Sequence, residues 1–372
     1  MKFSVVYDYQ IFSRQKYGGI SRYFVEVASR VSTIVDISAT TIAPVHLNRH
    51  LDDGKYQYIG RRFEFSTKIG RLIGPANDFL FKRKLKRGNF DIIHRTYYTK
   101  ARLPSEYKVV LTVFDMVHEL YPELLHRLDR TTVAKRIAVD QADHIICISE
   151  CTKRDLMQMF GVPEEKISVV LLGFSLRADA RGDGYPDRTG TAGNQPFILY
   201  VGHRHAYKNF DRFLEAYASS RRLRASHRVV AFGARSFTQR EIARFREFGL
   251  TDQDVTWIGG GDNVLRDLYE TAAMFVYPSL YEGFGIPPLE AMNFECPVVC
   301  SNTSSIPEVV GNAAEFFDPL DVDSIRTGME KVAFDRTRRD ELIALGRQRV
   351  QLFSWDRCAA ETAAVYKNLL GA

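Results

Sequence analysis

The chain has 372 residues, of which 45% are hydrophobic and 26% charged, a balance typical of a soluble protein with two domains. No run of 18 or more apolar residues occurs, and the start, MKFSVVYDYQ, lacks the apolar core of a signal peptide, so neither a transmembrane helix nor a secreted protein is expected. A net charge of +6 permits an anionic substrate or an anionic membrane surface, and we expect no nucleic acid partner.

Five cysteines, an odd number in a chain without a signal peptide, indicate a reducing, cytoplasmic environment. The pairs Cys147/Cys151 and Cys296/Cys300 have C-x3-C spacing, but three of these four fall in or beside strand-like runs. We therefore expect them to be small buried hydrophobes and not metal ligands.

Strand-like and helix-like segments alternate along the first half of the chain. The expected strands are 4–7, 91–94, 109–113, 144–149 and 168–171, and the expected helices are 20–31, 131–142 and 152–160, the last closed by Gly161. Such alternation predicts an α/β fold with a parallel sheet.

Residues 177–195 contain almost no apolar side chains and are rich in Gly, Asp and Arg, which indicates a linker after a first domain at 1–176. A second α/β series follows from residue 196, with expected strands at 197–201, 229–232, 255–258, 274–277, 297–301 and 314–317. Open parallel sheets bind ligands beyond the carboxyl ends of their strands. Two facing sheets would therefore hold one ligand in the cleft between them.

Gly18 and Gly19 follow the first strand and stand just before a helix. Two glycines allow a ligand close to the backbone, and a helix N-terminus favours an anion, although a plain loop-to-helix turn explains them equally well. No G-x-G-x-x-G pattern follows this strand, so the fingerprint of a dehydrogenase is absent.

Two strand ends in the first half carry polar and aromatic side chains. Asp115 and His118 come just past the strand 109–113, and His94 ends another strand with Tyr97 and Tyr98 nearby. Cleft chemistry is expected at such strand ends, and the rings could line an acceptor pocket. Structural packing is the alternative for each of them.

The segment Gly70–Phe90 combines apolar and basic side chains, which could lie on an anionic membrane surface or form a solvated basic helix face. Its apolar members are Leu72, Ile73, Phe79, Leu80 and Phe81, and its basic members are Lys82, Arg83, Lys84, Lys86 and Arg87.

The stretch YVGHRHAYKNF places Arg204 and Lys208 in a loop beyond a strand end. Arg supplies a planar fork and Lys a point charge, so the two cations could hold two phosphates. The neighbouring histidines at i and i+2 are a weak indication of a metal, and we expect none.

The stretch SLYEGFGIPPLEAM has Glu282 and Glu290 on either side of a Gly-x-Gly turn and two prolines. Pro287 and Pro288 are expected at the N-cap and first position of a helix, with Glu290 in its first turn, where the helix dipole alone would stabilise it. Glu282 lies in the loop without that explanation. Carboxylates accept hydrogen bonds from paired hydroxyls, so the two acids predict that each glutamate binds a different sugar of one ligand.

The D-x-D at Asp321 and Asp323 resembles a metal-diphosphate site, but it precedes a helix. We interpret Asp321 as an N-cap and Asp323 as an acid of the first turn.

Nearly the whole chain resembles family four of the retaining glycosyltransferases, which have the GT-B architecture. Glu282 to Glu290 matches the family's E-x7-E motif, and YVGHRHAYKNF, SNTSSIPEVVGNAA and ISECTKRDL resemble further segments. The resemblance implies two Rossmann-like parallel-sheet domains facing a cleft. It also implies a C-terminal helix, 353–372, that crosses back to the first domain, so that the second domain is 196–352.

The resemblance also implies roles for single residues. His118, Arg204, Lys208 and Glu282 would be catalytic, with Glu282 on the transferred sugar and Lys208 and Arg204 on the diphosphate. The donor would further contact Gly18 and Gly19, backbone groups of Phe284, Gly285 and Ile286, and Glu290, which would hold the ribose. Many relatives carry His before the Asp of the first domain and Arg before the Lys of the second, where this chain has Phe114 and Tyr207.

The resulting hypothesis is a metal-independent enzyme without a cofactor. It would move a sugar from a nucleotide diphosphate donor to a glycan or polyprenyl-linked acceptor, working in the cytoplasm or at the inner face of the membrane. A loose resemblance to bacterial polysaccharide mannosyltransferases favours GDP-mannose. A transferase using a UDP-sugar, a sugar-nucleotide epimerase of similar fold and a non-catalytic binding protein are the alternatives.

Overall fold

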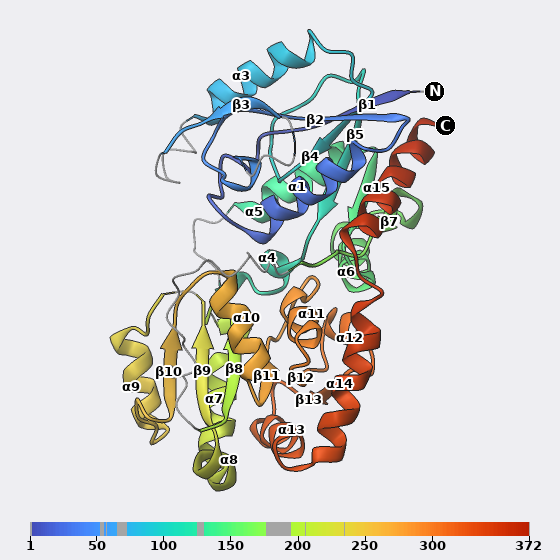
Figure 1. The fold of residues 1–372 in the computed structure, drawn as a ribbon. Coiled ribbons are helices and arrows are strands. Elements are labelled where there is room, and N and C mark those ends of the chain that lie inside the picture. Colours follow the sequence, from blue (N-terminus) through green and yellow to red (C-terminus); the bar gives the residue numbers. More distant parts are fainter. Residues whose placement is uncertain are drawn as a thin grey trace, which may run out of the picture. The chain divides into compact units, whose positions relative to one another are not determined.

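The computed structural model describes residues 2–52, 56, 58–64, 73–124, 130–175, 195–204, 206–233 and 235–371. The chain divides into two compact units (Figure 1), unit 1 with Met1–Gly173 and Phe353–Ala372, and unit 2 with Phe174–Leu352. All but the last residue of the expected linker, 177–195, lies outside the described residues.

Unit 1 is built on a parallel sheet of seven strands in the order β3-β2-β1-β4-β5-β6-β7. The central strands are apolar runs that are buried on both faces, as expected for a parallel sheet covered by helices. The strands are β1 (Phe3–Tyr7), β2 (Ile37–His46), β3 (Tyr58–Arg62), β4 (Ile92–Arg95), β5 (Lys108–Val113), β6 (His144–Cys147) and β7 (Ile167–Val169).

The helices of unit 1 include the C-terminal helix of the chain, which packs against the first helix (Figure 1). The helices are α1 (Gly19–Val31), α3 (Gly74–Leu85), α4 (Val117–Leu120), α5 (Thr131–Gln141), α6 (Glu150–Phe160) and α15 (Trp355–Leu370). The Tyr366 hydroxyl of α15 lies 3.0 Å from that of Tyr7 on β1. The last helix is thus joined to the first strand inside the core of unit 1.

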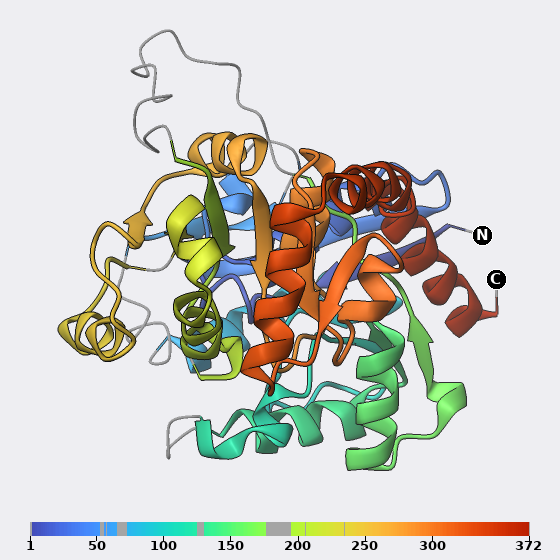
Figure 2. The same ribbon diagram turned by 90° about the horizontal axis from the view of Figure 1, so that it is seen from below.

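Unit 2 repeats this plan with six parallel strands in the order β10-β9-β8-β11-β12-β13. These are β8 (Phe197–Val201), β9 (Arg228–Phe232), β10 (Val255–Ile258), β11 (Met274–Tyr277), β12 (Val298–Ser301) and β13 (Ala314–Phe317). The helices are α7 (Phe210–Ser219), α8 (Arg221–Ser226), α9 (Gln239–Glu247), α10 (Asp262–Thr271), α11 (Ile286–Asn293), α12 (Ile306–Val310), α13 (Val322–Phe334) and α14 (Arg336–Val350). Helix α7 packs beside α13 (Figure 2), and side chains of both join the core beneath the sheet.

Each sheet has a point where the strand order reverses. This topological switch point lies between β1 and β4 in unit 1 and between β8 and β11 in unit 2. Connections leave the two strands in opposite directions there, which opens a crevice at the carboxyl edge of the sheet. The segments after β8 and β11 are therefore the natural place for a ligand in unit 2.

The prediction of an α/β fold with two parallel sheets is confirmed. Two strands of unit 1, β2 and β3, were not predicted from the sequence. Strand β2 contains Pro44, where its register with β3 shifts, and β3 lies at the sheet edge with mostly exposed side chains. Neither strand shows the continuous apolar run of a central parallel strand.

Several smaller predictions can also be compared with the structure. All five cysteines are buried and free, which confirms the predicted burial of the four in C-x3-C pairs. Asp321 caps α13 by accepting a hydrogen bond from the Asp323 amide at 2.9 Å, as expected. The described residues contain no group of three or more potential metal ligands. Among the described helices, none is both long and apolar enough to cross a bilayer.

Candidate active site

A lysine and a glutamate meet at the switch point of unit 2. Lys208 ends a short 3-10 turn after β8 (Ala206–Lys208), and Glu282 lies in the loop after β11. The Lys208 Nζ is 2.6 Å from Glu282 Oε1, and their side chains are 18% and 13% exposed. The Leu280 amide also donates to the Tyr207 carbonyl at 2.8 Å, so backbone as well as charge joins the two loops.

Unusual backbone conformations occur in the loop after β8 and in the loop after β12, which contacts the glutamate loop. Asn209, directly after the lysine, has a left-handed backbone with φ of 57°, and Ser304 has φ of 55°. Such conformations are costly for residues other than glycine and persist where surrounding contacts hold them. The Asn209 side chain donates to the Pro319 carbonyl at 2.7 Å, and the Ser304 hydroxyl accepts from the Glu282 amide at 3.0 Å.

Serine and threonine hydroxyls hold the glutamate loop in place. Ser305 donates to the carbonyls of Glu282 and Phe284, both at 2.8 Å, and Thr303 donates to that of Leu280 at 3.1 Å. Sequence reasoning assigned no role to Thr303, Ser304 or Ser305. The spacing of hydroxyl residues in SNTSS was the available indication, but it does not say which loop they contact.

The start of α11 differs from the prediction. The N-cap is Gly285, whose φ of 127° requires glycine, and Pro287 and Pro288 are the second and third helical residues rather than the N-cap and first. Glu290 is consequently the fifth residue of the helix, so placing it in the first turn was wrong. The dipole explanation for this acid is weaker as a result, because the effect fades beyond the first turn.

Glu290 is largely buried, with 7% of its surface exposed, beside the fully buried Tyr269. The Tyr269 hydroxyl lies 3.5 Å from Glu290 Oε2, at the limit of a hydrogen bond. Burial, and then the charge of Glu290, raise the pKa of Tyr269 well above its usual value. Burial and Glu282 have the same effect on the pKa of Tyr277, so both carboxylates lie near a neutral phenol.

Arg204, predicted to act with Lys208 on the diphosphate, is held by contacts within unit 2. Its Nε donates to Glu241 Oε1 at 2.6 Å, its Nη2 donates to the Arg235 carbonyl at 2.8 Å, and its side chain is only 5% exposed. The guanidinium also stacks over the ring of Phe237 at 4.9 Å. These contacts fix the loop after β8 to the start of α9.

Glu241, the partner of Arg204, was not identified from the sequence. It belongs to a capping box with Thr238 at the start of α9. Burial would raise the pKa of its carboxyl, but the hydrogen bonds from Arg204 and Thr238 outweigh burial and hold that pKa below its usual value. The T-x-x-E pattern is detectable in the sequence as a capping box, but its arginine partner is not.

The glycine pair of unit 1 is at the start of α1, with Gly18 as N-cap and Gly19 as the first helical residue. A Cβ on Gly18 would come within 2.2 Å of Gln15 Oε1, whereas Gly19 has open space around it. The fully buried Asn48 holds this turn by donating to the Gln15 carbonyl at 2.7 Å. A side chain at position 18 would therefore displace the end of the Gln15 side chain, whereas Gly19 leaves the backbone accessible.

His118 lies on the short helix α4, and its side chain is half-buried. An internal ion pair that the sequence did not reveal holds this helix: Lys135 Nζ lies 2.6 Å from Glu119 Oε2, with side chains 0% and 2% exposed. Lys135 also donates to the Asp115 carbonyl at 2.8 Å. Asp115 and His118 are therefore anchored from α5 by one buried cation.

His94 and Tyr98 lie in the core of unit 1 and not on an open surface. The His94 ring nitrogens are 2.6 Å from the Tyr366 hydroxyl and 2.8 Å from Thr112 Oγ1, and burial lowers its pKa to about 3. Tyr97 is half-buried under the Arg14 guanidinium, 5.0 Å from its ring. The packing alternative fits His94 and Tyr98, while Tyr97 keeps an accessible face.

Two parallel-sheet units, the second with a lysine and a carboxylate at its switch point, are the arrangement expected of the GT-B class of glycosyltransferases. Residues 17–177 match the family described as Glycosyltransferase Family 4, and residues 184–349 match the one described as Glycosyl transferases group 1. The chain belongs to glycosyltransferase family 4, and it is a glycosyltransferase.

Curated relatives cover most of the chain. It is 29% identical over 375 residues to the O-antigen chain mannosyltransferase B of Escherichia coli, covering 94% of this chain and 96% of that protein. It is 31% identical over 312 residues to the MMP alpha-(1->4)-mannosyltransferase of Mycolicibacterium hassiacum, covering 77% and 72%.

Among solved structures, the sucrose-phosphate synthase of Thermosynechococcus elongatus superposes with a TM-score of 0.78 over 100% of both chains at 18% identity. The glycosyltransferase WaaG, involved in lipopolysaccharide biosynthesis, gives 0.69 over 98% of this chain and 99% of that one, also at 18% identity. At these identities the likeness concerns the fold alone.

Proposed function

We propose that this glycosyltransferase moves mannose from GDP-mannose to a glycan or lipid-linked acceptor of a surface polysaccharide, with retention of the anomeric configuration. The observation that carries the choice of sugar is the relationship along nearly the whole chain to an O-antigen chain mannosyltransferase. Relatives over shorter stretches are also named mannosyltransferases.

The ion pair at the switch point of unit 2 supports a direct role for Lys208 in the transfer. The bond between the anomeric carbon and the phosphate oxygen breaks, so negative charge grows on the leaving nucleoside diphosphate. An ammonium group at that point binds the transition state more tightly than the substrate, which lowers the barrier. In this proposal Glu282 accepts hydrogen bonds from hydroxyl groups of the transferred sugar.

Retention follows in this proposal from attack on the same face as the leaving group. The acceptor hydroxyl forms the new bond to the anomeric carbon, and its proton passes to the departing phosphate oxygen. Gly18, Gly19, the backbone of 284–286 and Glu290 would hold the remaining parts of the donor. An epimerase would handle the same donor without an acceptor, so release of nucleoside diphosphate only when acceptor is present separates the two reactions.

We also propose that the transfer needs no metal ion. The D-x-D acids support this, because Asp321 caps a helix and Asp323 pairs with Arg326 at 3.0 Å. Activity is expected to survive an excess of chelator. Loss of turnover that manganese or magnesium restores would overturn this part of the proposal.

The acceptor is proposed to be presented at an anionic membrane surface, where the basic helix α3 of unit 1 would make contact. Phe79 on α3 is 66% exposed, which supports such a contact. Phe81, expected on the same surface, is 2% exposed and packs 6.0 Å from the Tyr9 ring, and Leu72 lies outside the described residues.

The donor is tested by thermal unfolding in the presence of GDP, UDP and the other nucleoside diphosphates. A ligand at 100 times its Kd adds about 2.7 kcal/mol to the free energy of unfolding, an easily measured shift. Stabilisation by GDP and not UDP, followed by transfer of radiolabelled mannose to a membrane-derived acceptor, is the expected result. Stabilisation by UDP alone would replace the GDP-mannose proposal with a UDP-sugar transferase.

A further inference from the structure

The helix that carries His118 is too short to hold its own place. Helix α4 (Val117–Leu120) has four residues, and a single helical turn is not stable without tertiary contacts. It follows β5 at the carboxyl edge of the sheet of unit 1, which is the edge where parallel sheets bind ligands. The half-buried His118 side chain therefore depends on other parts of unit 1 for its position.

One buried cation contacts α4 and the residues before it at several points. The Lys135 Nζ donates to the Asp115 carbonyl at 2.8 Å and to Glu119 Oε2 at 2.6 Å. It also lies 5.2 Å from the centre of the Tyr98 ring. Asp115 and Glu119 stand before and after His118 in the chain, so Lys135 holds the segment on both sides of the histidine.

Helix α5, which carries Lys135, is itself tied to the sheet. The Arg95 side chain at the end of β4 donates to Gln141 Oε1 at 2.9 Å and to the Ala101 carbonyl at 2.7 Å. Arg95 is 1% exposed, so these contacts are internal to unit 1. The lysine therefore projects from a fixed helix onto a short one.

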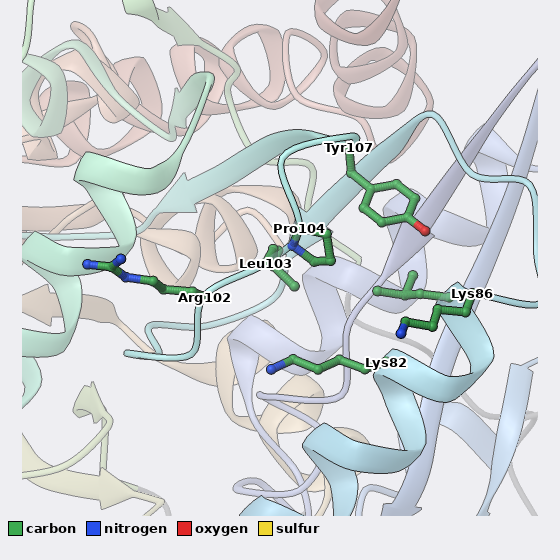
Figure 3. Close-up of a pocket in the computed structure, with 7 residues that line it drawn as sticks. Lys82, Lys86, Arg102, Leu103, Pro104 and Tyr107 are labelled. Carbon is green, nitrogen blue, oxygen red and sulfur yellow. The ribbon is translucent and has the colours of Figure 1, made fainter.

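The segment after Ala101 lines a pocket of about 290 Å³ with α3 (Figure 3). Its cations do not converge, because Arg102 is directed away from Lys82 and Lys86. The lining of this pocket is therefore not a single anion site. The charge at Lys135 differs from these cations because it is buried and has defined acceptors.

Stability alone gives little reason for the pair of Lys135 and Glu119. Taking two charges out of water is costly, and apolar side chains of similar volume often give equal or higher stability. The two side chains are 0% and 2% exposed, and Glu119 Oε1 is buried without a hydrogen-bond partner in the part of the chain that the structure describes. An unmade hydrogen bond adds to the cost. Such a pair is better suited to fixing one geometry than to stabilising the fold.

We propose that Lys135 and Glu119 are positioning residues for the sugar transfer and that they act through His118. The pair holds α4 so that the imidazole stays where it contacts the substrate, while Lys135, which is 0% exposed, does not touch the substrate itself. The proposal rests on the proposed function and on the role predicted for His118. A displacement of about 1 Å at a group that contacts substrate can cost about 10²-fold in rate.

Two variants of the pair separate position from stability. Lys135→Met/Glu119→Leu has apolar side chains of similar size, which should preserve stability but release α4. Glu119→Gln keeps an oxygen that accepts from Lys135 but leaves the ammonium without a counter-charge, so it should lower stability and keep α4 in place. The matched control is Arg30→Met/Glu26→Leu, an ion pair in the last part of α1 whose glutamate side chain is 5% exposed.

We expect the apolar double variant to lose about tenfold to 10²-fold in kcat, with its Tm and its calorimetric affinity for nucleoside diphosphate close to those of the wild-type protein. Glu119→Gln should show the reverse, with a lower Tm and a kcat within a few-fold of wild type. The control should keep its kcat. Hydrogen exchange in the peptide that contains α4 should be faster in the apolar double variant and unchanged in the control.

A double-variant cycle tests whether the pair acts through His118. His118→Ala should lower kcat by itself. Adding Lys135→Met/Glu119→Leu to it should cause little further loss, because the group that the pair positions is already gone. Losses that multiply fully would show that the pair does not act through His118 and would overturn the proposal.

A kcat of the apolar double variant within a few-fold of the control would also overturn the proposal, as would equal losses of kcat and of nucleoside diphosphate affinity. Every kcat is measured with the donor that the wild-type enzyme uses. A UDP-sugar as that donor would thus refute the GDP-mannose proposal without affecting this comparison. If the apolar double variant does not fold, Lys135→Gln/Glu119→Gln removes both charges with a smaller change in shape and provides the same comparison.

Discussion

The two sheets have the same kind of switch point but different chemistry there. In unit 2, Lys208 and Glu282 form an ion pair whose side chains keep 18% and 13% exposure. In unit 1, Asp8 follows β1 and Thr96 follows β4, and both are buried. Asp8 Oδ1 accepts from the Thr96 hydroxyl at 2.6 Å and from the Thr96 amide at 2.9 Å.

The difference lies in whether polar groups are left accessible. Burial raises the pKa of Asp8, against the effect of the hydrogen bonds from Thr96, so this carboxyl belongs to the internal framework. The ion pair of unit 2 is partly exposed. A charged or polar group of a ligand can therefore replace Glu282 as the partner of Lys208, or Lys208 as the partner of Glu282. Topology thus provides the crevice in both units, and side-chain exposure decides which crevice can carry out charge-dependent chemistry.

The largest effect is expected for Lys208→Ala. Removal of a preorganised group that meets developing charge costs about 10²–10³ in kcat, while the fold should survive because the lysine lies in a loop. Lys208→Arg should recover only part of the activity, since a planar fork does not replace a compact ammonium. Turnover of a radiolabelled donor measures both.

Lys331→Ala is the matched control, because Lys331 pairs with Glu315 at 2.8 Å in the same unit but away from the switch point. Its turnover should be close to that of the wild-type protein. If the kcat of Lys208→Ala is within a few-fold of the kcat of that control, the ion pair at the switch point of unit 2 does not contribute to catalysis.

A smaller effect separates the two glutamates of the E-x7-E motif. Glu290→Ala should weaken nucleoside diphosphate binding by roughly 10–100-fold, the value of a hydrogen bond to a charged group. Glu282→Ala should lower kcat. From the sequence alone, Glu282→Ala is predicted to leave the affinity for nucleoside diphosphate nearly unchanged. The ion pair makes the prediction more specific: the affinity of this variant should equal or exceed that of the wild-type protein, because Lys208 loses a competing carboxylate.

Calorimetric titration of both variants with nucleoside diphosphate decides between these assignments. Opposite or clearly unequal changes in affinity support separate roles for the two acids. Equal weakening would mean that Glu282 and Glu290 hold the same part of the donor.

Arg204→Ala is expected to reduce stability rather than catalysis alone. Its loss removes an ion pair to Glu241 and a hydrogen bond to the Arg235 carbonyl, at a cost of about 2 kcal/mol in the free energy of unfolding. Urea unfolding of Arg204→Ala, Glu241→Gln and the double variant measures the coupling. A large loss of kcat without loss of stability would instead assign Arg204 to the diphosphate.

The smallest effect concerns pH and the core histidine of unit 1. In the unfolded chain His94 has its ordinary pKa of 6.5, whereas burial in the folded protein lowers the pKa of His94 to about 3. Unfolding therefore takes up a proton between these values, and His94 lowers stability as the pH falls from about 6.5 towards 3. His94→Gln removes that contribution.

The Tm difference between wild type and His94→Gln should consequently narrow as the pH falls from about 7.5 to 5. The remaining histidines are present in both proteins, so their titration largely cancels in the difference. A constant difference across this range would show that His94 is not buried as a neutral side chain.

The sequence by itself determined the two parallel sheets, apart from β2 and β3, and the motif around Glu282, because strand and helix periodicity and loop composition are local properties. It did not determine the edge strand β3, whose side chains are mostly exposed, or the start of α11, where Gly285 takes the cap position expected for proline. It also could not assign partners to charges. Glu282 meets Lys208 across 74 positions and Arg204 meets Glu241 across 37, and only the packing of the sheet fixes which charges come together.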